Sequence, residues 1–117
     1  MNMNTNIQNN TQNNIQNNIQ NILKKYPDKI PIIVKKDPRS LAPDIEKSKF
    51  LVPKDLSVAQ FIYIIRKRIK LEPEKAIFLY FGNNNILPSC ITVEEAYYKY
   101  KKDDVLYATY TSENTFG

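Results

Sequence analysis

The stretch 49-KFLVPKDLSVAQFIYIIRKRIKL-71 decides the fold, because a short strand, a turn and an amphipathic helix follow one another directly in it. Apolar residues in 49-KFLVPKD-55 predict the strand, and Pro53 ends it because proline has no amide hydrogen to donate to a sheet. Ser57 and Gln60 stand three residues apart, as in a capping box, and mark the start of the helix.

The predicted helix has an apolar face and a basic face. The apolar residues that fall at helical spacing are Val58, Phe61, Ile62, Ile65 and Ile69. The other side carries Arg66, Lys67, Arg68 and Lys70. A helix with this pattern is expected to lie across one face of a sheet and to expose its cations.

Strand patterns lie on both sides of this helix in the sequence. Before it, 30-IPIIVKK-36 is rich in β-branched residues and can pair antiparallel with the strand at 49–55. After it, 76-AIFLYFG-82 predicts a strand that ends in the turn 83-NNN-85, and 105-VLYATYTS-112 alternates in the way expected of a strand. These patterns predict a sheet built from segments far apart in the chain.

Two smaller elements complete the pattern. The segment 86-ILP-88 is a candidate for a very short strand, and Thr92 with Glu95 repeats the capping-box form before a second helix, 93-VEEAYYKYKK-102. The order strand, strand, helix, strand, short strand, helix, strand suits an α+β sheet covered on one face.

The amino-terminal tract is rich in Asn and Gln and holds no charge before Lys24. Residues 1–13 are expected to form a flexible tail, because such sequence buries too little apolar surface to become ordered. Ile15, Ile19 and Ile22 recur every three or four residues and predict a helix over residues 14–25 that docks on the domain. Residues 26–112 then form one domain, and residues 113–117 form a tail.

Charge is distributed unevenly along the 117 residues. Lys24 to Lys70 contain 13 Lys and Arg against 5 Asp and Glu, whereas Leu71 to Gly117 contain 4 against 7. A basic first half favours acidic partners, whether a peptide, a phospholipid headgroup or a nucleic acid. The chain has no apolar run long enough to cross a bilayer and no signal-peptide pattern, so a cytoplasmic location is expected.

The residue inventory argues against an enzyme. There is no histidine, and Cys90 is the single cysteine, so neither a Cys-His nucleophile nor a zinc site is expected. The two glycines, Gly82 and Gly117, cannot build a phosphate-binding loop. No catalytic residue, metal site or cofactor is therefore predicted.

The element order resembles the ubiquitin-like β-grasp fold, in which a mixed sheet of about four strands wraps on a central helix, here with an N-terminal helical extension. The stretches 25-KYPDKIPIIVKK-36, 49-KFLVPKDLSVAQFIYIIRKRIKL-71, 73-PEKAIFLYF-81 and 112-SENTFG-117 are similar to the autophagy ubiquitin-like modifiers, the family that includes GABA-receptor-associated protein and microtubule-associated protein light chain three. The similarity runs from Lys24 to the end.

This resemblance implies conjugation through Gly117. In the family, activating and conjugating enzymes pass the terminal carboxylate on as a thioester and join it to phosphatidylethanolamine on autophagosomal membranes. Phe116 would be recognised by the processing or conjugating enzymes, which include a processing and delipidating cysteine protease. A terminal glycine suits this task, because it enters a narrow channel without a Cβ clash. Gly117 at the end is consistent with a processed terminus, a truncated chain or a gene that encodes the exposed glycine.

The resemblance also implies capture of aromatic-x-x-aliphatic motifs in cargo receptors and adaptors, with 30-IPIIVKK-36 as the sheet edge that accepts the peptide. The aromatic residue would enter a first pocket formed by Ile22, Pro31, Ile33, Lys49, Leu51 and Val105. The aliphatic residue would enter a second pocket formed by Phe50, Val52, Pro53, Leu56, Phe61 and Ile64; Val52, Phe61 and Ile64 could equally belong to the core. The basic rim that would meet acids beside the motif consists of Lys29, Lys47, Lys49 and Arg68.

The sequence is also compatible with two alternatives. The first is the related modifier that is joined to a protein lysine in the same pathway, although the NTFG ending and the IRKRI helix favour the lipid-linked type. The second is a basic nucleic-acid-binding domain. Nucleic acid is not the expected partner, because the aromatic residues fall in apolar positions and do not interleave with the cations.

Overall fold

The structure is a computed structural model that describes residues 18–112. The elements with named bounds are β1 (Lys29–Lys36), β2 (Lys49–Pro53), α2 (Val58–Ile69), β3 (Phe78–Phe81), α3 (Val93–Tyr100) and β4 (Leu106–Thr111). Residues 18–25 are also helical. The predicted tail at 1–13, the first four residues of the helix predicted at 14–25, and the tail at 113–117 lie outside the described residues.

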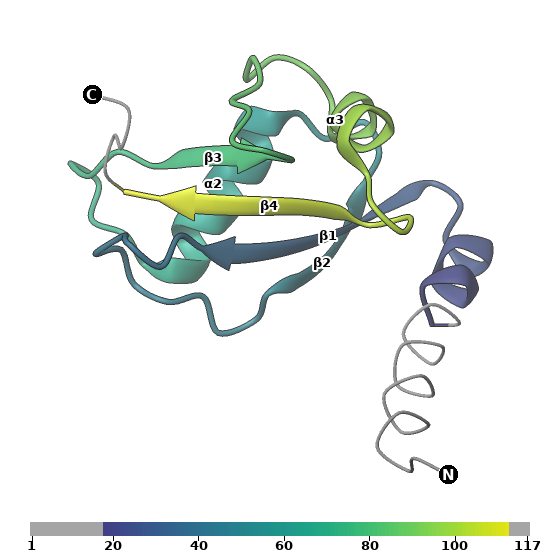
Figure 1. Ribbon diagram of the computed structural model, residues 1–117, viewed down its shortest axis with the longest axis horizontal. Coiled ribbons are helices and arrows are strands. Elements are labelled where there is room, and N and C mark those ends of the chain that lie inside the picture. The colour runs from purple at the N-terminus through teal and green to yellow at the C-terminus, as the bar shows by residue number, and fades with distance from the viewer. Residues whose placement is uncertain (1–17, 113–117) are drawn as a thin grey trace, which may run out of the picture.

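The four strands form one mixed sheet in the order β2-β1-β4-β3 (Figure 1). The two central strands, β1 and β4, are parallel, and the two outer pairs are antiparallel. Helix α2 covers one face of the sheet, and α3 lies near one end of it (Figure 1). The predicted α+β, ubiquitin-like β-grasp architecture is therefore confirmed.

The prediction that residues 30–36 form the sheet edge is wrong. Strand β1 is paired on both sides, through Lys29 to Ile33 with β2 and through Ile32 to Lys36 with β4. The edge beside β1 is instead β2. Local sequence patterns could not reveal this, because the strand that fills the second side of β1 comes from the far end of the domain.

The core lies between α2 and the sheet. Its fully buried side chains include Ile32 and Val34 from β1, Phe61 and Ile65 from α2, and Leu106 from β4. Within residues 18–112, every helix is too short or too polar to cross a membrane.

The start of α2 follows the predicted capping box. Ser57 Oγ accepts a hydrogen bond from the Gln60 amide at 3.0 Å, and Gln60 Oε1 accepts one from the Ser57 amide at 2.9 Å. The helix ends at Ile69 and is capped by Lys70, whose φ of 54° is left-handed and whose amide donates to the carbonyls of Arg66 and Lys67. These contacts satisfy backbone groups that a helix end otherwise leaves unpaired.

The segment between β3 and α3 differs from its prediction. Residues 86–88 do not form a strand; instead Asn85 bridges back to Phe81, with amide-to-carbonyl distances of 2.8 and 3.0 Å. The turn is tight because Gly82 and Asn84 both adopt positive φ, so the chain reverses before residue 86 can align with a neighbouring strand. Helix α3 ends at Tyr100, two residues earlier than predicted, and Lys102 bridges to Val105.

Candidate functional site

A hollow of about 610 Å³ lies between the helical residues 18–25 and strands β1 and β2. Its lining consists of Asn18, Ile19, Asn21, Ile22, Pro31, Ile32, Ile33, Lys47, Lys49, Phe50, Leu51 and Val105. This lining includes all six residues predicted for the first pocket. The structure thus brings together side chains from the helical residues, both strands and the residue before β4.

The pairing register places four of these residues on one side of the sheet. Pro31 lies opposite Leu51, and Ile33 lies opposite Lys49. Successive residues of a strand point to opposite faces, and Ile32 between them is buried in the core beneath α2. The four therefore share the face of the sheet that α2 does not cover. Val105 is almost completely buried, so it offers only a small area to the hollow.

The helical residues 18–25 form the other wall of the hollow. Ile19 and Ile22 from this segment line it, and the Tyr26 amide donates to the Ile22 carbonyl at 2.8 Å to close the last helical turn. Gln20 Nε2 donates to Asp104 Oδ2 at 2.9 Å, which joins the helix to the turn before β4. The wall is thus fixed to the domain by a side-chain contact as well as by the chain itself.

The residues predicted for the second pocket lie on β2, on α2 and in the turn between them. Val52 and Phe61 are 5% and 0% exposed and belong to the hydrophobic core. Phe50, Leu56 and Ile64 are partly buried, and Pro53 is exposed. Only these four could offer appreciable surface to a ligand.

Phe50 connects this second group to the core and to the basic rim. Its ring packs edge-on against Phe61, with centroids 5.5 Å apart and an angle of 87° between the planes. The Arg68 guanidinium carbon lies 5.9 Å from the centroid of the Phe50 ring. The aromatic contact and the cation–π contact each favour this position of the ring.

The cations predicted for the rim lie on both sides of β2. Lys47 and Lys49 are exposed and line the hollow, whereas Arg68 stands on α2 beside Phe50. Lys29 is partly buried at the start of β1, opposite Pro53. The ion pairs found within residues 18–112 are Lys36–Asp44, Arg39–Asp37, Lys54–Asp28 and Lys101–Asp104. The described residues therefore leave the positive charge of this rim available to an acidic ligand.

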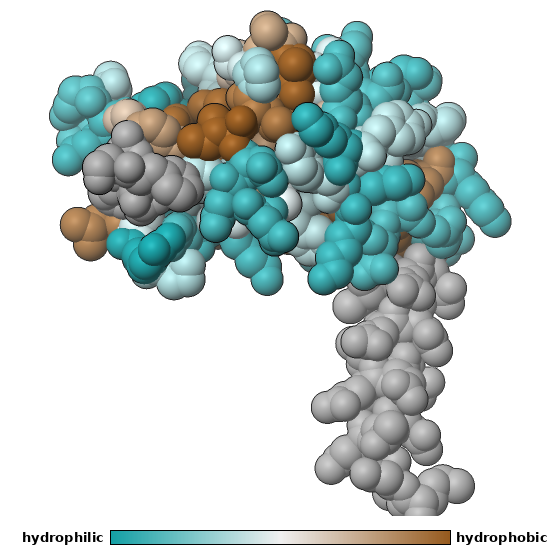
Figure 2. Space-filling model, turned by 45° about the horizontal axis from the view of Figure 1, so that its top comes forward, coloured by the Kyte–Doolittle hydropathy of each residue, from teal (hydrophilic) through white to brown (hydrophobic). Residues whose placement is uncertain are grey.

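A second hollow, of about 590 Å³, lies where the loop after β3 enters α3, and the sequence did not reveal it. Its lining consists of Leu87, Pro88, Ile91, Glu94, Glu95, Tyr98 and Lys99. Figure 2 shows a hydrophobic area along the top of the molecule, the side on which β3 and this loop lie. The available signal was the apolar run 86-ILP-88 directly after a polar turn, which the sequence assigned to a strand.

The sheet wrapped on α2 and the apolar hollow beside an edge strand define a ubiquitin-like domain with a surface suited to an extended ligand. The chain belongs to the Atg8 family of autophagy proteins: it matches the family described as "Autophagy protein Atg8 ubiquitin like" over residues 14–117. This match confirms the resemblance that the sequence motifs indicated.

Individual relatives agree with the family match. The chain is 52% identical to Autophagy-related protein 8d of Arabidopsis thaliana over 98 residues, which cover 82% of this chain and 80% of that protein. It is 54% identical to Autophagy-related protein 8B of Oryza sativa subsp. japonica, over 82% of this chain and 81% of that protein. The crystal structure of Trypanosoma brucei ATG8 superposes with a TM-score of 0.79 at 42% identity and covers 87% of this chain and 88% of that one.

Proposed function

We propose that this protein is a ubiquitin-like modifier of autophagy that is conjugated through Gly117 to phosphatidylethanolamine and that binds aromatic-x-x-aliphatic motifs along β2. Membership of the Atg8 family supports the conjugation. The observation that carries the peptide-binding part is an edge strand with apolar groups on both of its faces. On this proposal the protein moves between the cytoplasm and autophagosomal membranes.

An extended peptide that pairs with β2 would present its two key residues to opposite faces. Residues i and i+3 of a strand point to opposite sides and lie about 10 Å apart along it. The aromatic residue would enter the hollow beside Pro31 and Leu51. The aliphatic residue would reach the surface formed by Phe50, Pro53, Leu56 and Ile64. Backbone hydrogen bonds to β2 would supply affinity, and the two apolar sites would supply sequence preference.

Electrostatics favour a motif that has acids beside its aromatic residue. Lys47 and Lys49 line the hollow that would take the aromatic residue, and Arg68 stands beside the site for the aliphatic one. Acidic side chains next to the motif would therefore meet cations on either side of β2. Such complementarity mainly raises the association rate and orients the ligand.

The conjugation chemistry would use the partner enzymes and the carboxylate of Gly117. An activating enzyme adenylates the carboxylate, enzyme cysteines carry the acyl group as thioesters, and the amine of phosphatidylethanolamine displaces the last thiolate to form an amide. Phe116 would be read by the processing protease or by the conjugating machinery. The lipid anchors the domain stably, because each buried methylene contributes about 0.8 kcal/mol and two acyl chains exceed the marginal single-chain case.

The peptide-binding part is tested by calorimetry with a motif peptide that has acids on its amino-terminal side. Leu51→Ala combined with Lys49→Ala should weaken binding at least about tenfold, since truncating an interface anchor and removing a nearby charge each reduce affinity. The matched control is Tyr98→Ala with Lys99→Ala, which removes an exposed aromatic and a cation from α3. Equal losses in both double variants would contradict the assignment to β2.

The conjugation part is tested by intact-mass measurement of membrane-bound protein after autophagy is induced. Gly117→Ala should abolish the lipid-linked species, because the added Cβ obstructs entry of the tail into the enzyme channel. Thermal unfolding of the purified variant should match that of the parent protein. Undiminished lipid-linked mass in the variant would refute conjugation at this residue.

A further inference from the structure

We propose that the end of the domain from which the tail leaves is a membrane-contact surface. In this surface, Leu41 enters the interfacial layer of a phospholipid bilayer, and Lys70 and Lys75 bind headgroup phosphates. The inference rests on the proposed lipid conjugation, because a lipid at Gly117 is what brings a bilayer to this end. The surface is separate from the peptide-binding edge at β2.

Leu41 is held outward by a fixed loop. Its side chain is 90% exposed, whereas its neighbours Ser40 and Ala42 are each only 5% exposed. Ser40 Oγ accepts hydrogen bonds from the Ala42 amide at 3.1 Å and from the Ser112 amide at 3.2 Å. Because the residues on both sides are buried and bonded, the exposure of this large apolar side chain is a property of the folded loop.

The same loop is fastened to the end of β4. The Tyr110 hydroxyl donates to the Pro43 carbonyl at 2.7 Å, and the Asp37 amide donates to the Tyr110 carbonyl at 2.9 Å. Leu41 is therefore placed beside Ser112, the last described residue before the conjugation tail. Wherever a lipid holds the tail, this loop is near the bilayer.

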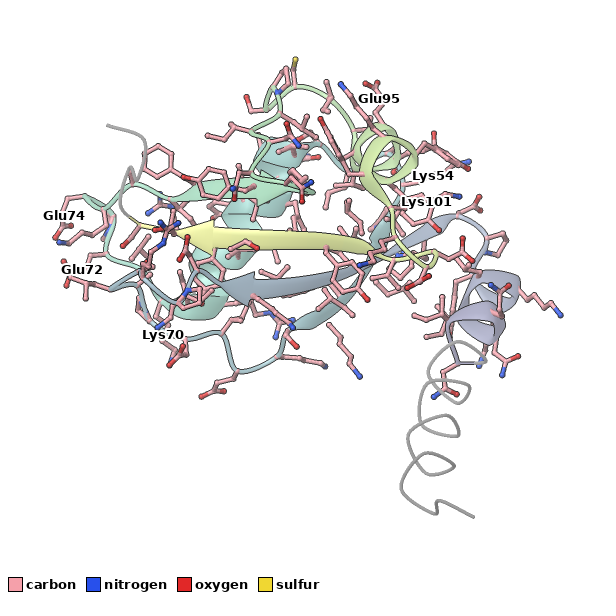
Figure 3. All side chains as sticks on the ribbon, viewed as in Figure 1. Lys54, Lys70, Glu72, Glu74, Glu95 and Lys101 are labelled. Carbon is pink, nitrogen blue, oxygen red and sulfur yellow. The ribbon has the colours of Figure 1, made fainter. Side chains whose placement is uncertain are left out.

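The two lysines line the same hollow as Leu41, which has a volume of about 380 Å³. Its lining consists of Leu41, Ala42, Pro43, Lys70, Leu71, Glu72, Lys75 and Ser112. Two of its three charged residues are lysines. Figure 3 shows Lys70 and Glu72 at the end of the molecule where β4 finishes. An exposed apolar side chain that shares a hollow with two lysines matches the layer in which headgroup phosphates lie above the acyl chains.

Arg66 holds the second lysine in this surface. Its Nη1 donates to the Lys75 carbonyl at 2.7 Å and to the Glu72 carbonyl at 3.4 Å, so the segment after α2 is tied to the helix. Lys70 is placed by the left-handed residue conformation that ends α2. The folded backbone therefore fixes the positions of these apolar and cationic residues in the absence of a bilayer.

The tether makes a weak contact effective. The five residues from 113 to 117 can span at most about 18 Å, so a lipid-linked domain keeps this surface close to the bilayer. One apolar side chain with two lysines, opposed by Glu72, is too weak to bind a membrane from solution. Linking the domain to the lipid raises the effective concentration to the millimolar range and favours the contact.

The test uses a fluorescent reporter in a chain that has no tryptophan of its own. Cys90→Ser and Gly117→Cys allow coupling to maleimide-phosphatidylethanolamine in vesicles of phosphatidylcholine and phosphatidylethanolamine. Leu41→Trp is added as the reporter, and Tyr98→Trp, on α3 and also well exposed, is the matched control. The coupling needs no conjugation enzyme, so failure of the proposed enzymatic conjugation would leave this test intact.

On tethered protein, the emission of Leu41→Trp should shift to the blue, and lipids brominated near the headgroup should quench it about twofold. The emission of Tyr98→Trp should stay unshifted and unquenched. Adding Lys70→Gln and Lys75→Gln should reduce the quenching of Leu41→Trp. If tethering leaves Leu41→Trp emission unchanged, or if both reporters are quenched equally, the proposed surface is wrong.

Discussion

At the scale of single residues, Tyr110 illustrates how one buried polar atom ties two distant parts of the domain together. Its side chain is completely buried, yet its hydroxyl reaches the Pro43 carbonyl across the loop that carries Leu41. Burial also raises the pKa of the Tyr110 phenol above the ordinary value of 10.0, because the phenolate loses hydration there. The neutral form is the one that fits the folded state.

Tyr110→Phe should lower the free energy of unfolding by about 1 kcal/mol at neutral pH, since it leaves the Pro43 carbonyl without this donor. The pH dependence should also change. A raised pKa in the folded state gives stability that is complete below the unfolded pKa and is lost as pH rises through the folded one. The parent protein should therefore lose stability above about pH 10, and the variant should lose less of it.

Urea unfolding between neutral and strongly alkaline pH measures both effects. Part of the alkaline loss should remain in the variant, because burial also raises the pKa of Tyr97. Tyr63→Phe is the control, since the side chain of Tyr63 is largely exposed on α2. A Tyr110→Phe curve parallel to that of the parent protein would contradict the role assigned to burial.

At the scale of elements, local sequence patterns predicted those helices and strands whose formation depends on residues close together in the chain. The capping box at Ser57 and Gln60 placed the start of α2, and the alternation of Leu106, Ala108 and Tyr110 predicted β4, whose observed burial follows it. The sequence could not show which strand would lie next to β1. That depends on the parallel pairing with β4, a contact between the two ends of the domain.

The residues of the candidate site, like the elements of the fold, could be predicted in part. The six residues of the first pocket came from the family resemblance, and the structure brings them together at one hollow. The burial of Val52 on β2 and of Phe61 on α2 could not be decided, because an apolar residue buried beneath a neighbouring element and one beside a groove have the same local pattern. The exposure of Leu41 was missed because it depends on how Ser40 and Ala42 are buried by other segments.

The turn after β3 permits a paired test of backbone conformation. Gly82 has φ of 56°, and a Cβ there would lie 2.9 Å from Tyr100 Cδ1, so Gly82→Ala should cost at least about 1–2 kcal/mol of unfolding free energy. Asn84 has φ of 64°, so Asn84→Gly should be neutral or stabilising by up to about 1 kcal/mol. Denaturant midpoints of the two variants measure the difference. Equal destabilisation by both would show that φ does not decide the effect.

At the scale of the whole molecule, the proposed peptide site and the proposed membrane contact lie apart. The helical residues 18–25, which wall the first hollow, stand at the end of the sheet opposite to the end where β4 finishes (Figure 1). Lys70 and Glu72 mark that other end (Figure 3). A domain held by its tail would thus keep β2 open to receptors, so membrane attachment and motif binding need not compete.

The uneven distribution of charge along the chain is also a property of the whole molecule. The segment Lys24 to Lys70 carries the excess of cations, and it contains β1, β2 and α2, the elements around the proposed peptide site. Cations spread over several elements act on an approaching acidic peptide before any contact forms, so they should raise the association rate more than they slow dissociation.

Motif binding should consequently depend on salt through its association rate. Raising NaCl from about 0.05 to about 0.3 M shortens the screening length and should slow association roughly tenfold, with little change in dissociation. Stopped-flow fluorescence with a labelled motif peptide separates the two rates. A peptide whose flanking acids are replaced by amides should show a much smaller effect, as should Lys47→Gln with Arg68→Gln. If association is equally fast at both salt concentrations, the basic half of the molecule does not steer its ligands, and the peptide site must rely on its apolar contacts alone.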